Sequence, residues 1–156
     1  MTDYSLMNKQ LLSLTEGVED GISNLANASA LLFHTLEGLN WAGFYLYKEG
    51  ALLLGPFQGK TACTKIPMGK GVCGTAAEKG ETIVVPDVHA FPGHIACDGD
   101  SNSEIVIPLY VGGRLFGVLD IDSPVFNRFT EEDCVGLEGF ARVLEQGLTS
   151  AKRSYA

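Results

Sequence analysis

Two neighbouring segments in the last third of the chain alternate between apolar and other side chains, and this pattern constrains the fold most. Residues 104–111 read Glu-Ile-Val-Ile-Pro-Leu-Tyr-Val and residues 115–122 read Leu-Phe-Gly-Val-Leu-Asp-Ile-Asp, with Gly112-Gly113 between them. Successive side chains of a strand point to opposite faces of a sheet. The pattern therefore predicts a β-hairpin in which one face of each strand is apolar.

The register of this hairpin decides where its carboxylates lie. With a two-residue turn at Gly112-Gly113, Glu104 would pair with Ile121 and lie on the apolar face. With a three-residue turn, Glu104 pairs with Asp122, and Asp120 lies on the same face. A slip of one residue moves every side chain to the other face. We therefore predict the three-residue turn, although Gly-Gly is also common as a two-residue turn.

The three acids would then share a face with Val106, Val118 and Phe116, and they form the strongest candidate site. Directly opposed residues of antiparallel strands have Cβ atoms about 4.5–5.5 Å apart. Two carboxylates at that distance do not both ionise easily, so the pKa of one rises. A carboxyl group that stays protonated near neutral pH can act as a general acid. We expect a functional site here rather than a solvated acidic strand end.

Periodicity and turn residues place the other elements around this hairpin. A capping box over 130–133 starts the last helix. The order of elements predicts an α+β domain, with one mostly antiparallel sheet covered by helices. The other expected elements are helices over 4–18, 21–37, 69–79 and 131–150, strands over 41–47, 51–54 and 82–85, and a long irregular loop over 86–102.

Length and charge exclude several classes of protein. The 156 residues fit one domain, and a net charge of −8 leaves no basic face for nucleic acid. The longest apolar runs, such as 105–111, are too short to span a bilayer. The N-terminus lacks the basic and apolar segments of a signal peptide. We therefore expect a cytoplasmic protein whose cysteines rest as thiols.

Three of the four cysteines lie in polar, glycine-flanked segments, which suits redox chemistry. Cys73 is in the first turn of a predicted helix, where the helix dipole can lower the pKa of a thiol. Cys97 is in the long loop, and Cys63 is in a strand or loop. Cys134 lies on the apolar face of the last helix and is expected to be a core residue. A thiolate, an acid and a second thiol suffice for reduction through a sulfenic acid and a disulfide.

Three segments resemble binding motifs for a dinucleotide, calcium or zinc, but the residue spacing or sequence context argues against each site. The G-x-G-x-x-G at 69–74 follows Pro67 rather than a hydrophobic strand, which argues against a dinucleotide site. The acidic run from 98 onward lacks the glycine and glutamate of a calcium loop. The cysteines with His89 or His94 lack the closely spaced ligand pairs of a zinc site. We expect neither a metal ion nor a bound cofactor.

Several stretches, spread over nearly the whole chain, together resemble one known family. They are residues 40–46, 54–60, 62–63, 69–76, 87–89, 93–98, 101–106 and 117–123. They are similar to the free methionine-(R)-sulfoxide reductase family, single-domain enzymes with the GAF fold, and the three-cysteine spacing is specific to that family. The resemblance implies a single GAF-like domain over 1–156. Its parts are N-terminal helices over 1–38, the sheet and active-site loop over 39–125, and a C-terminal helix over 130–151.

The family implies a reaction and roles for the cysteines. Free L-methionine (R)-sulfoxide is reduced to L-methionine, and thioredoxin restores the oxidised enzyme. By position, Cys97 matches the attacking cysteine and Cys63 its usual disulfide partner. Cys73 matches a third cysteine that can enter disulfide exchange, and its place at a helix start keeps it an alternative nucleophile. Dimers are typical of the family, so a homodimer is also implied.

The family also implies roles for acids and aromatic residues. Glu104, Asp120 and Asp122 match its active-site acids, with Glu104 the expected proton donor to the sulfoxide oxygen. The two aspartates would bind the substrate ammonium or tune Glu104, and backbone N–H groups of 93–98 would hold the carboxylate. Trp41 matches a residue that contacts the substrate methyl group, and Tyr45 points to the same side of its strand.

Two other functions stay open at this stage. A sensory GAF module would bind a small molecule without chemistry, but it normally adjoins an output domain for which 156 residues leave no room. A thiol peroxidase-like protein would use the same cysteines on a hydroperoxide and would need no site for an ammonium group.

Overall fold

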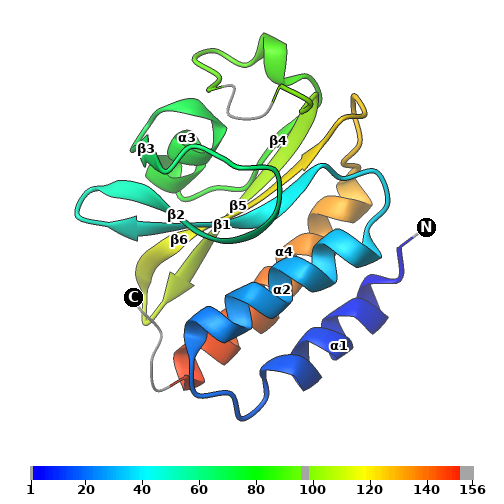
Figure 1. Cartoon of the computed structure of the whole chain (residues 1–156), viewed down its shortest axis with the longest axis vertical. Helices are drawn as coiled ribbons and strands as arrows, with labels where there is room; N and C mark the ends of the chain where they lie inside the picture. Colours follow the sequence, from blue (N-terminus) through cyan, green and yellow to red (C-terminus); the bar gives the residue numbers. More distant parts are fainter. Residues whose placement is uncertain (1, 96–98, 152–156) are drawn as a thin grey trace.

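An antiparallel sheet separates three longer helices from one short helix and a loop (Figure 1). The computed structural model describes residues 2–95 and 99–151. The strand order is β3-β2-β1-β6-β5-β4, and each neighbouring pair is antiparallel. The predicted α+β class is therefore confirmed. The strands are β1 (Trp41–Lys48), β2 (Ala51–Gly59), β3 (Lys65–Pro67), β4 (Ile83–Val85), β5 (Ser103–Val111) and β6 (Arg114–Ser123).

The helices lie close to where periodicity predicts them. Helices α2 (Gly21–Thr35) and α4 (Glu131–Ser150) cover one face of the sheet, and α1 (Tyr4–Thr15) packs against these two helices on their outer side (Figure 1). Helix α3 (Gly71–Lys79) covers the other face. The predicted capping box at the start of α4 is confirmed. Among the described residues, no helix combines the length and apolar character needed to cross a membrane.

Strand β2 runs five residues beyond the predicted end at residue 54. It continues through Gly55 and Pro56, residues typical of turns, because a β-bulge accommodates them. Gly43 pairs with Phe57 and Tyr45 with Leu54, so β2 carries an extra residue at Gly55-Pro56. A bulge tolerates glycine and proline that would otherwise end a strand. Two short elements were not predicted at all: β3, and the 3₁₀ turn η1 (Val88–Ala90) inside the long loop.

The hairpin of β5 and β6 has the predicted register at its acidic end and a different turn. Glu104 pairs with Asp122, as predicted, but Val111 pairs with Arg114, so the turn has two residues rather than three. Phe116 is an extra residue in β6 that forms a β-bulge, and this bulge shifts the register by one residue between the turn and the acidic end. The prediction that Phe116 shares the acidic face is therefore wrong. An extra residue reverses the alternation, and Phe116 packs in the core on the side of α1, α2 and α4.

The two faces of the sheet form two separate hydrophobic clusters. The first, between the sheet and α1, α2 and α4, holds Phe44, Ile107 and Leu119 among others, and the free thiol of Cys134 packs against it as predicted. The second lies under α3 and includes Trp41 and Tyr45 of β1 and Val106 and Val118 of the hairpin. The acids of the hairpin lie on the α3 face, at the edge of this second cluster.

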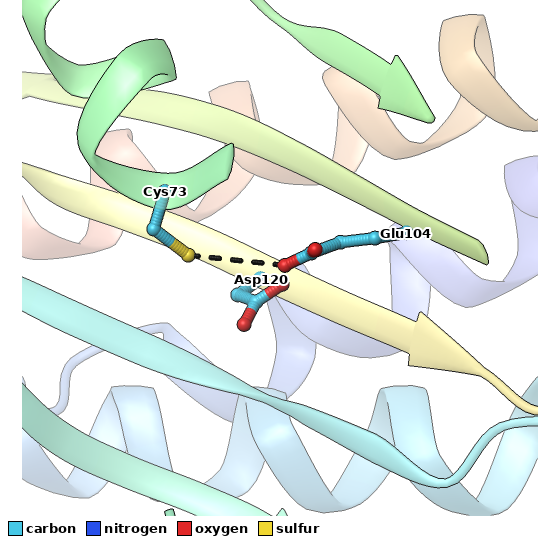
Figure 2. A group of neighbouring side chains, drawn as sticks. All are labelled: Cys73, Glu104 and Asp120. Atoms are coloured by element: carbon cyan, nitrogen blue, oxygen red, sulfur yellow. Dashed lines mark hydrogen bonds between the residues drawn. The ribbon is translucent and has the colours of Figure 1, made fainter. Parts of the chain in front are cut away.

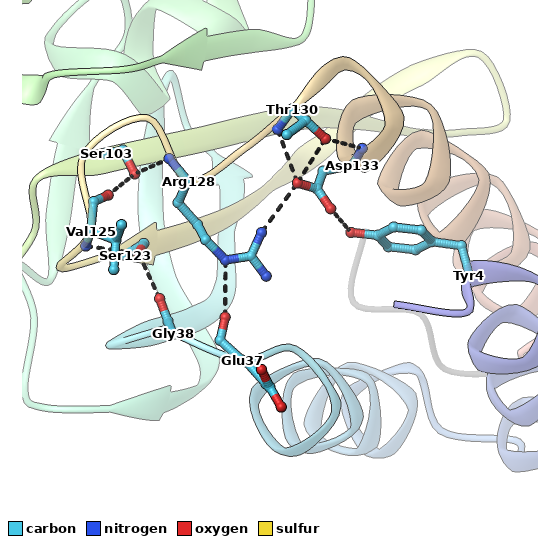
Figure 3. A network of polar contacts seen from close by, with 9 residues as sticks. All are labelled: Tyr4, Glu37, Gly38, Ser103, Ser123, Val125, Arg128, Thr130 and Asp133. Carbon is cyan, nitrogen blue, oxygen red and sulfur yellow. Dashed lines mark hydrogen bonds and ion pairs between the residues drawn. The ribbon is translucent and has the colours of Figure 1, made fainter. Parts of the chain in front are cut away.

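A polar network holds the acidic ends of β5 and β6 in place (Figure 3). Ser103, next to Glu104, donates from Oγ to the Val125 carbonyl at 2.6 Å and accepts from the Arg128 backbone N–H. Ser123, next to Asp122, donates to the Gly38 carbonyl. Arg128 in turn donates to the Glu37 carbonyl at 3.0 Å and to Asp133 of α4 at 3.1 Å. The strand ends that carry the acids are thus tied to α2 and α4.

Replacing Gly43 with alanine is expected to lower the free energy of unfolding by roughly 2–3 kcal/mol, because a new Cβ would overlap backbone and side-chain atoms of Phe57 across the β1–β2 pair. Urea unfolding measures the change. Gly99→Ala is the matched control, since a Cβ there meets no atom of the described residues within 4 Å. Equal urea midpoints for the two variants would contradict this account of the close packing.

Candidate active site

A cavity lies between the sheet and α3, and it brings together residues from distant parts of the chain. Its lining residues come mainly from the first turn of α3 on one side and from strands β1, β5 and β6 on the other. Several predicted site residues line it: Trp41, Tyr45, Cys73, Glu104, Asp120 and Asp122. Cys63 lies between β2 and β3, beside the lining residue Ala62. Cys97 lies outside the described residues.

The three acids are almost completely removed from water. Glu104 and Asp120 are each 6% exposed and Asp122 is 8% exposed. Burial raises the pKa of Glu104 well above its usual range, and the nearby charges of Asp120 and Asp122 raise it further. Burial also raises the pKa of Asp120, although hydrogen bonds from its neighbours oppose this rise. The expectation of a carboxyl group with a raised pKa is confirmed.

One acidic oxygen of the cluster is left without a partner. Asp120 Oδ1 is buried and has no hydrogen-bond partner among the described residues. Leaving a buried acceptor unsatisfied typically costs about 1–3 kcal/mol, and more when the group is charged. Such a group marks a place where a ligand can supply the missing donor.

Cys73 reaches the acids from the first turn of α3 (Figure 2). Its Sγ lies 3.9 Å from Glu104 Oε2, and the thiol is free and buried. One atom each of Cys73, Glu104 and Asp120 lies within 4.8 Å of the others, close enough to contact one common cation.

The expected lowering of the pKa of Cys73 is wrong. Burial raises the pKa of this thiol well above its usual range, and the charges of Asp120, Glu104 and Asp122 raise it further. The helix dipole favours a thiolate by a modest amount at an exposed helix end. Removal from water beside carboxylates outweighs it here, so Cys73 is a weak candidate for the attacking thiolate.

Trp41 and Tyr45 form an aromatic wall and also hold the segment that carries Cys63. Both are 2% exposed, and their rings stack with centroids 5.9 Å apart, so their predicted common side is confirmed. The Tyr45 hydroxyl donates to the Cys63 carbonyl at 2.9 Å, and Trp41 Nε1 donates to the Lys60 carbonyl at 3.1 Å. Burial raises the pKa of Tyr45, so its hydroxyl remains a donor. Cys63 is itself disulfide-bonded, so the expectation that the cysteines rest as thiols is wrong for this residue.

Sequence reasoning missed several residues that the structure brings to the site. Phe57 stacks on Trp41 with ring centroids 5.1 Å apart, and it lies beyond residue 54, where the predicted strand ended. Lys70 and Val72, at the start of α3, line the cavity, as does His94, which was weighed only as a zinc ligand. The sequence signals for these positions were the glycine-rich motif at 69–74, the long loop, and the stretches 54–60, 69–76 and 93–98 that resemble the family.

Comparison with known proteins agrees with this architecture. The GAF domain model matches residues 20–148. The chain is 51% identical over 155 residues to the free methionine-R-sulfoxide reductase of Escherichia coli, which covers 98% of this chain and 94% of that protein. It is 59% identical over 148 residues to Protein YtsP of Bacillus subtilis, covering 94% and 91% of the two chains.

Solved structures of such reductases superpose closely on this chain. The Neisseria meningitidis free methionine-R-sulfoxide reductase, in complex with its substrate, has a TM-score of 0.91 at 44% identity, covering 98% of this chain and 92% of that chain. The Staphylococcus aureus fRMsr, also in complex with substrate, has a TM-score of 0.90 at 49% identity, covering 94% and 96%.

Fold and site together define a GAF-domain protein with a buried cluster of acids and a thiol. Within that class, the 51% identity to the Escherichia coli reductase extends over nearly the full length of both proteins, and this identifies the family. The chain belongs to the free methionine-(R)-sulfoxide reductase family.

Proposed function

We propose that this protein reduces free L-methionine (R)-sulfoxide to L-methionine. The observation that carries the proposal is the buried acid cluster beneath an aromatic wall, with Glu104 held protonated by burial and by neighbouring charges. A sulfoxide needs a proton on its oxygen as its sulfur is attacked, and this carboxyl group can supply one. The relatives that carry the reductase name support the same reaction.

In the first step, the Cys97 thiolate attacks the sulfoxide sulfur and Glu104 donates a proton to the oxygen. The S–O bond of the substrate breaks as the protonated oxygen passes to the cysteine sulfur. Methionine leaves as the thioether, and Cys97 is left as a sulfenic acid. The sulfoxide sulfur gains two electrons and the cysteine sulfur loses two. Trp41 and Tyr45 would pack against the substrate side chain, while Asp120 and Asp122 accept hydrogen bonds from its ammonium group.

In the second step, the Cys63 thiol displaces water from the sulfenic acid and a disulfide forms. A dithiol of the thioredoxin type then reduces this disulfide by exchange and returns both thiols. The hydrogen bond from Tyr45 to the Cys63 carbonyl supports this role, because it fixes the peptide of the second thiol beside the cavity. Cys73 would take part in disulfide exchange rather than in the attack. We also propose a cytoplasmic setting and a homodimer, as in the family.

A direct assay distinguishes this function from its two alternatives. The reduced protein is incubated with each epimer of free methionine sulfoxide, with hydrogen peroxide, and with thioredoxin, thioredoxin reductase and NADPH. Oxidation of NADPH is expected with the R epimer only. Consumption of peroxide alone would indicate a peroxidase, and binding without turnover would indicate a sensory module.

A further inference from the structure

Cys73 is a buried thiol that the proposed attack on the sulfoxide does not use, and it belongs to a cluster of possible metal ligands (Figure 2). Cys73, Glu104 and Asp120 each offer one atom, the thiol sulfur or a carboxylate oxygen. These three atoms all lie within 4.8 Å of one another, and all three residues are buried. One sulfur and two oxygens at this spacing make a donor set that a small cation can bridge.

The distance between the sulfur and the nearer carboxylate suits a tetrahedral ion. Zn²⁺ binds a cysteine sulfur at about 2.3 Å and a carboxylate oxygen at about 2.0–2.2 Å. In a tetrahedron with these bond lengths, the sulfur and the oxygen lie about 3.6 Å apart. Cys73 Sγ lies 3.9 Å from Glu104 Oε2. A small rotation of either side chain therefore closes this edge around an ion.

Asp120 gives the cluster an oxygen that is ready for a cation. This residue is 6% exposed and lines the cavity, and its Oδ1 has no hydrogen-bond partner among the described residues. A buried carboxylate oxygen without a donor or a counter-charge is costly. A cation would supply the missing partner and would also neutralise the neighbouring carboxyl groups of Glu104 and Asp122.

The fold holds these ligands close together before any ion binds. Glu104 pairs with Asp122 across the hairpin, so Asp120, two residues earlier on β6, is its diagonal neighbour on the same face. The polar network in Figure 3 fixes the acidic ends of both strands. Cys73 comes from α3, which packs on β5 and β6. A site whose ligands are already in place binds an ion with a smaller ordering cost.

The sulfur ligand decides which cations the cluster prefers. Soft thiolates select zinc and similar metals, whereas Mg²⁺ and Ca²⁺ take oxygen ligands. The thiol of Cys73 loses its proton when it becomes a ligand, as cysteines do in zinc sites. One thiolate and two carboxylates leave the fourth position of a tetrahedral ion to water.

We propose that Cys73, Glu104 and Asp120 bind one thiophilic divalent cation, with Zn²⁺ the expected ion, and that the bound ion blocks the cavity to the amino-acid substrate. The metal site stands on its own geometry, whereas the block rests on the proposed function, in which the same acids contact the substrate. As a metal ligand, Glu104 also has no proton to donate. The ion is thus a reversible inhibitor of the reaction and not its cofactor. This ligand set differs from the cysteines and histidines weighed from the sequence, because two carboxylates supply most of it.

Metal binding to the protein with its disulfide intact tests the site. In this form, the free thiols among the described residues are Cys73 and Cys134. Co²⁺ replaces Zn²⁺ in tetrahedral sites, and it gives a sulfur-to-metal charge-transfer band only when a thiolate is a ligand. We expect one Co²⁺ per chain with this band. Zn²⁺ should displace the Co²⁺, and an equal concentration of Mg²⁺ should not.

Variants assign the ion to these side chains. Cys73→Ser is expected to abolish the band and to weaken Zn²⁺ binding at least about tenfold, because loss of an outer-shell partner alone costs about 10–100-fold. Glu104→Gln and Asp120→Asn keep the size of each side chain and should each weaken Zn²⁺ binding at least about tenfold. Cys134→Ser is the matched control. Its thiol also lies beside a carboxylate, 3.7 Å from Glu138 Oε1, and the variant should bind both metals as wild type does.

A band that survives in Cys73→Ser, or that disappears in Cys134→Ser, would overturn the metal site. So would a wild type that binds no Zn²⁺, even if it reduces the sulfoxide. A Zn²⁺ site that depends on Cys73, in a protein that reduces no sulfoxide, would refute the proposed function and leave the metal site standing.

Competition tests the block separately. L-Methionine is expected to raise the apparent Kd of wild type for Zn²⁺ in proportion to its concentration, because its ammonium group would need the same acids. A Kd for Zn²⁺ that stays constant while L-methionine saturates the protein would overturn the block.

Discussion

The Cys97→Ser variant is expected to release methionine from L-methionine (R)-sulfoxide at least about 10³-fold more slowly than wild type, because the covalent route requires a thiolate. A hydroxyl group at this position cannot form the sulfenic acid that keeps the oxygen. The measurement is a single turnover: fully reduced enzyme is mixed with substrate without thioredoxin, and released methionine is quantified against enzyme.

Two further cysteine variants sharpen this experiment. Cys134→Ser is the matched control, since this thiol packs against the hydrophobic cluster on the other side of the sheet and should leave release unchanged. Cys73→Ser tests the alternative nucleophile, which the raised pKa of Cys73 makes unfavourable. A full equivalent of methionine from Cys97→Ser, with none from Cys73→Ser, would move the attack to Cys73.

The Glu104→Gln variant is expected to slow methionine release by roughly 10²–10⁴. Glutamine keeps the size of the side chain and an N–H donor toward Asp120, but it has no acidic proton to donate.

In wild type, Glu104 must be protonated to act as the acid, so the rate of methionine release should fall as pH rises through the raised pKa of Glu104. Asp120→Asn removes a charge that raises this pKa, so the fall should begin at lower pH. The readout is the pH–rate profile. An alkaline limb that persists unchanged in Glu104→Gln would assign the proton to another group.

The Glu104→Gln substitution should increase the stability of the protein, although it lowers the activity. A carboxyl group whose pKa is higher in the folded chain than in the unfolded chain contributes stability at low pH. That contribution is lost as pH rises through the folded-state pKa. The pKa of buried Glu104 is raised in this way. Glu104→Gln should therefore unfold at a higher temperature than wild type at neutral and alkaline pH, with the difference shrinking toward acid pH. Loss of activity with gained stability would separate a catalytic role from damage to the fold.

Local sequence patterns correctly predicted the helices and the acidic end of the hairpin, because the formation of these elements depends on residues close together in the chain. The apolar spacing and capping residues of α4 are an example, and so is the pairing of Glu104 with Asp122. The hairpin turn was misjudged because a bulge at Phe116 restores the register that a longer turn would have set. A bulge is decided by packing on both faces of the sheet, which alternation alone does not record.

The sequence by itself determined the α+β class, the acids that share one face, and, through resemblance, the family and its three cysteines. Only the tertiary structure decided how deeply the acids are buried and in which direction the pKa of Cys73 moves. The first turn of α3, 31 residues from Glu104 in the chain, closes over the acids and removes them from water. That burial raises the pKa of Cys73 where its helix position had suggested a lower one. Solvation depends on everything that surrounds a group, and residues distant in the chain supply most of those surroundings.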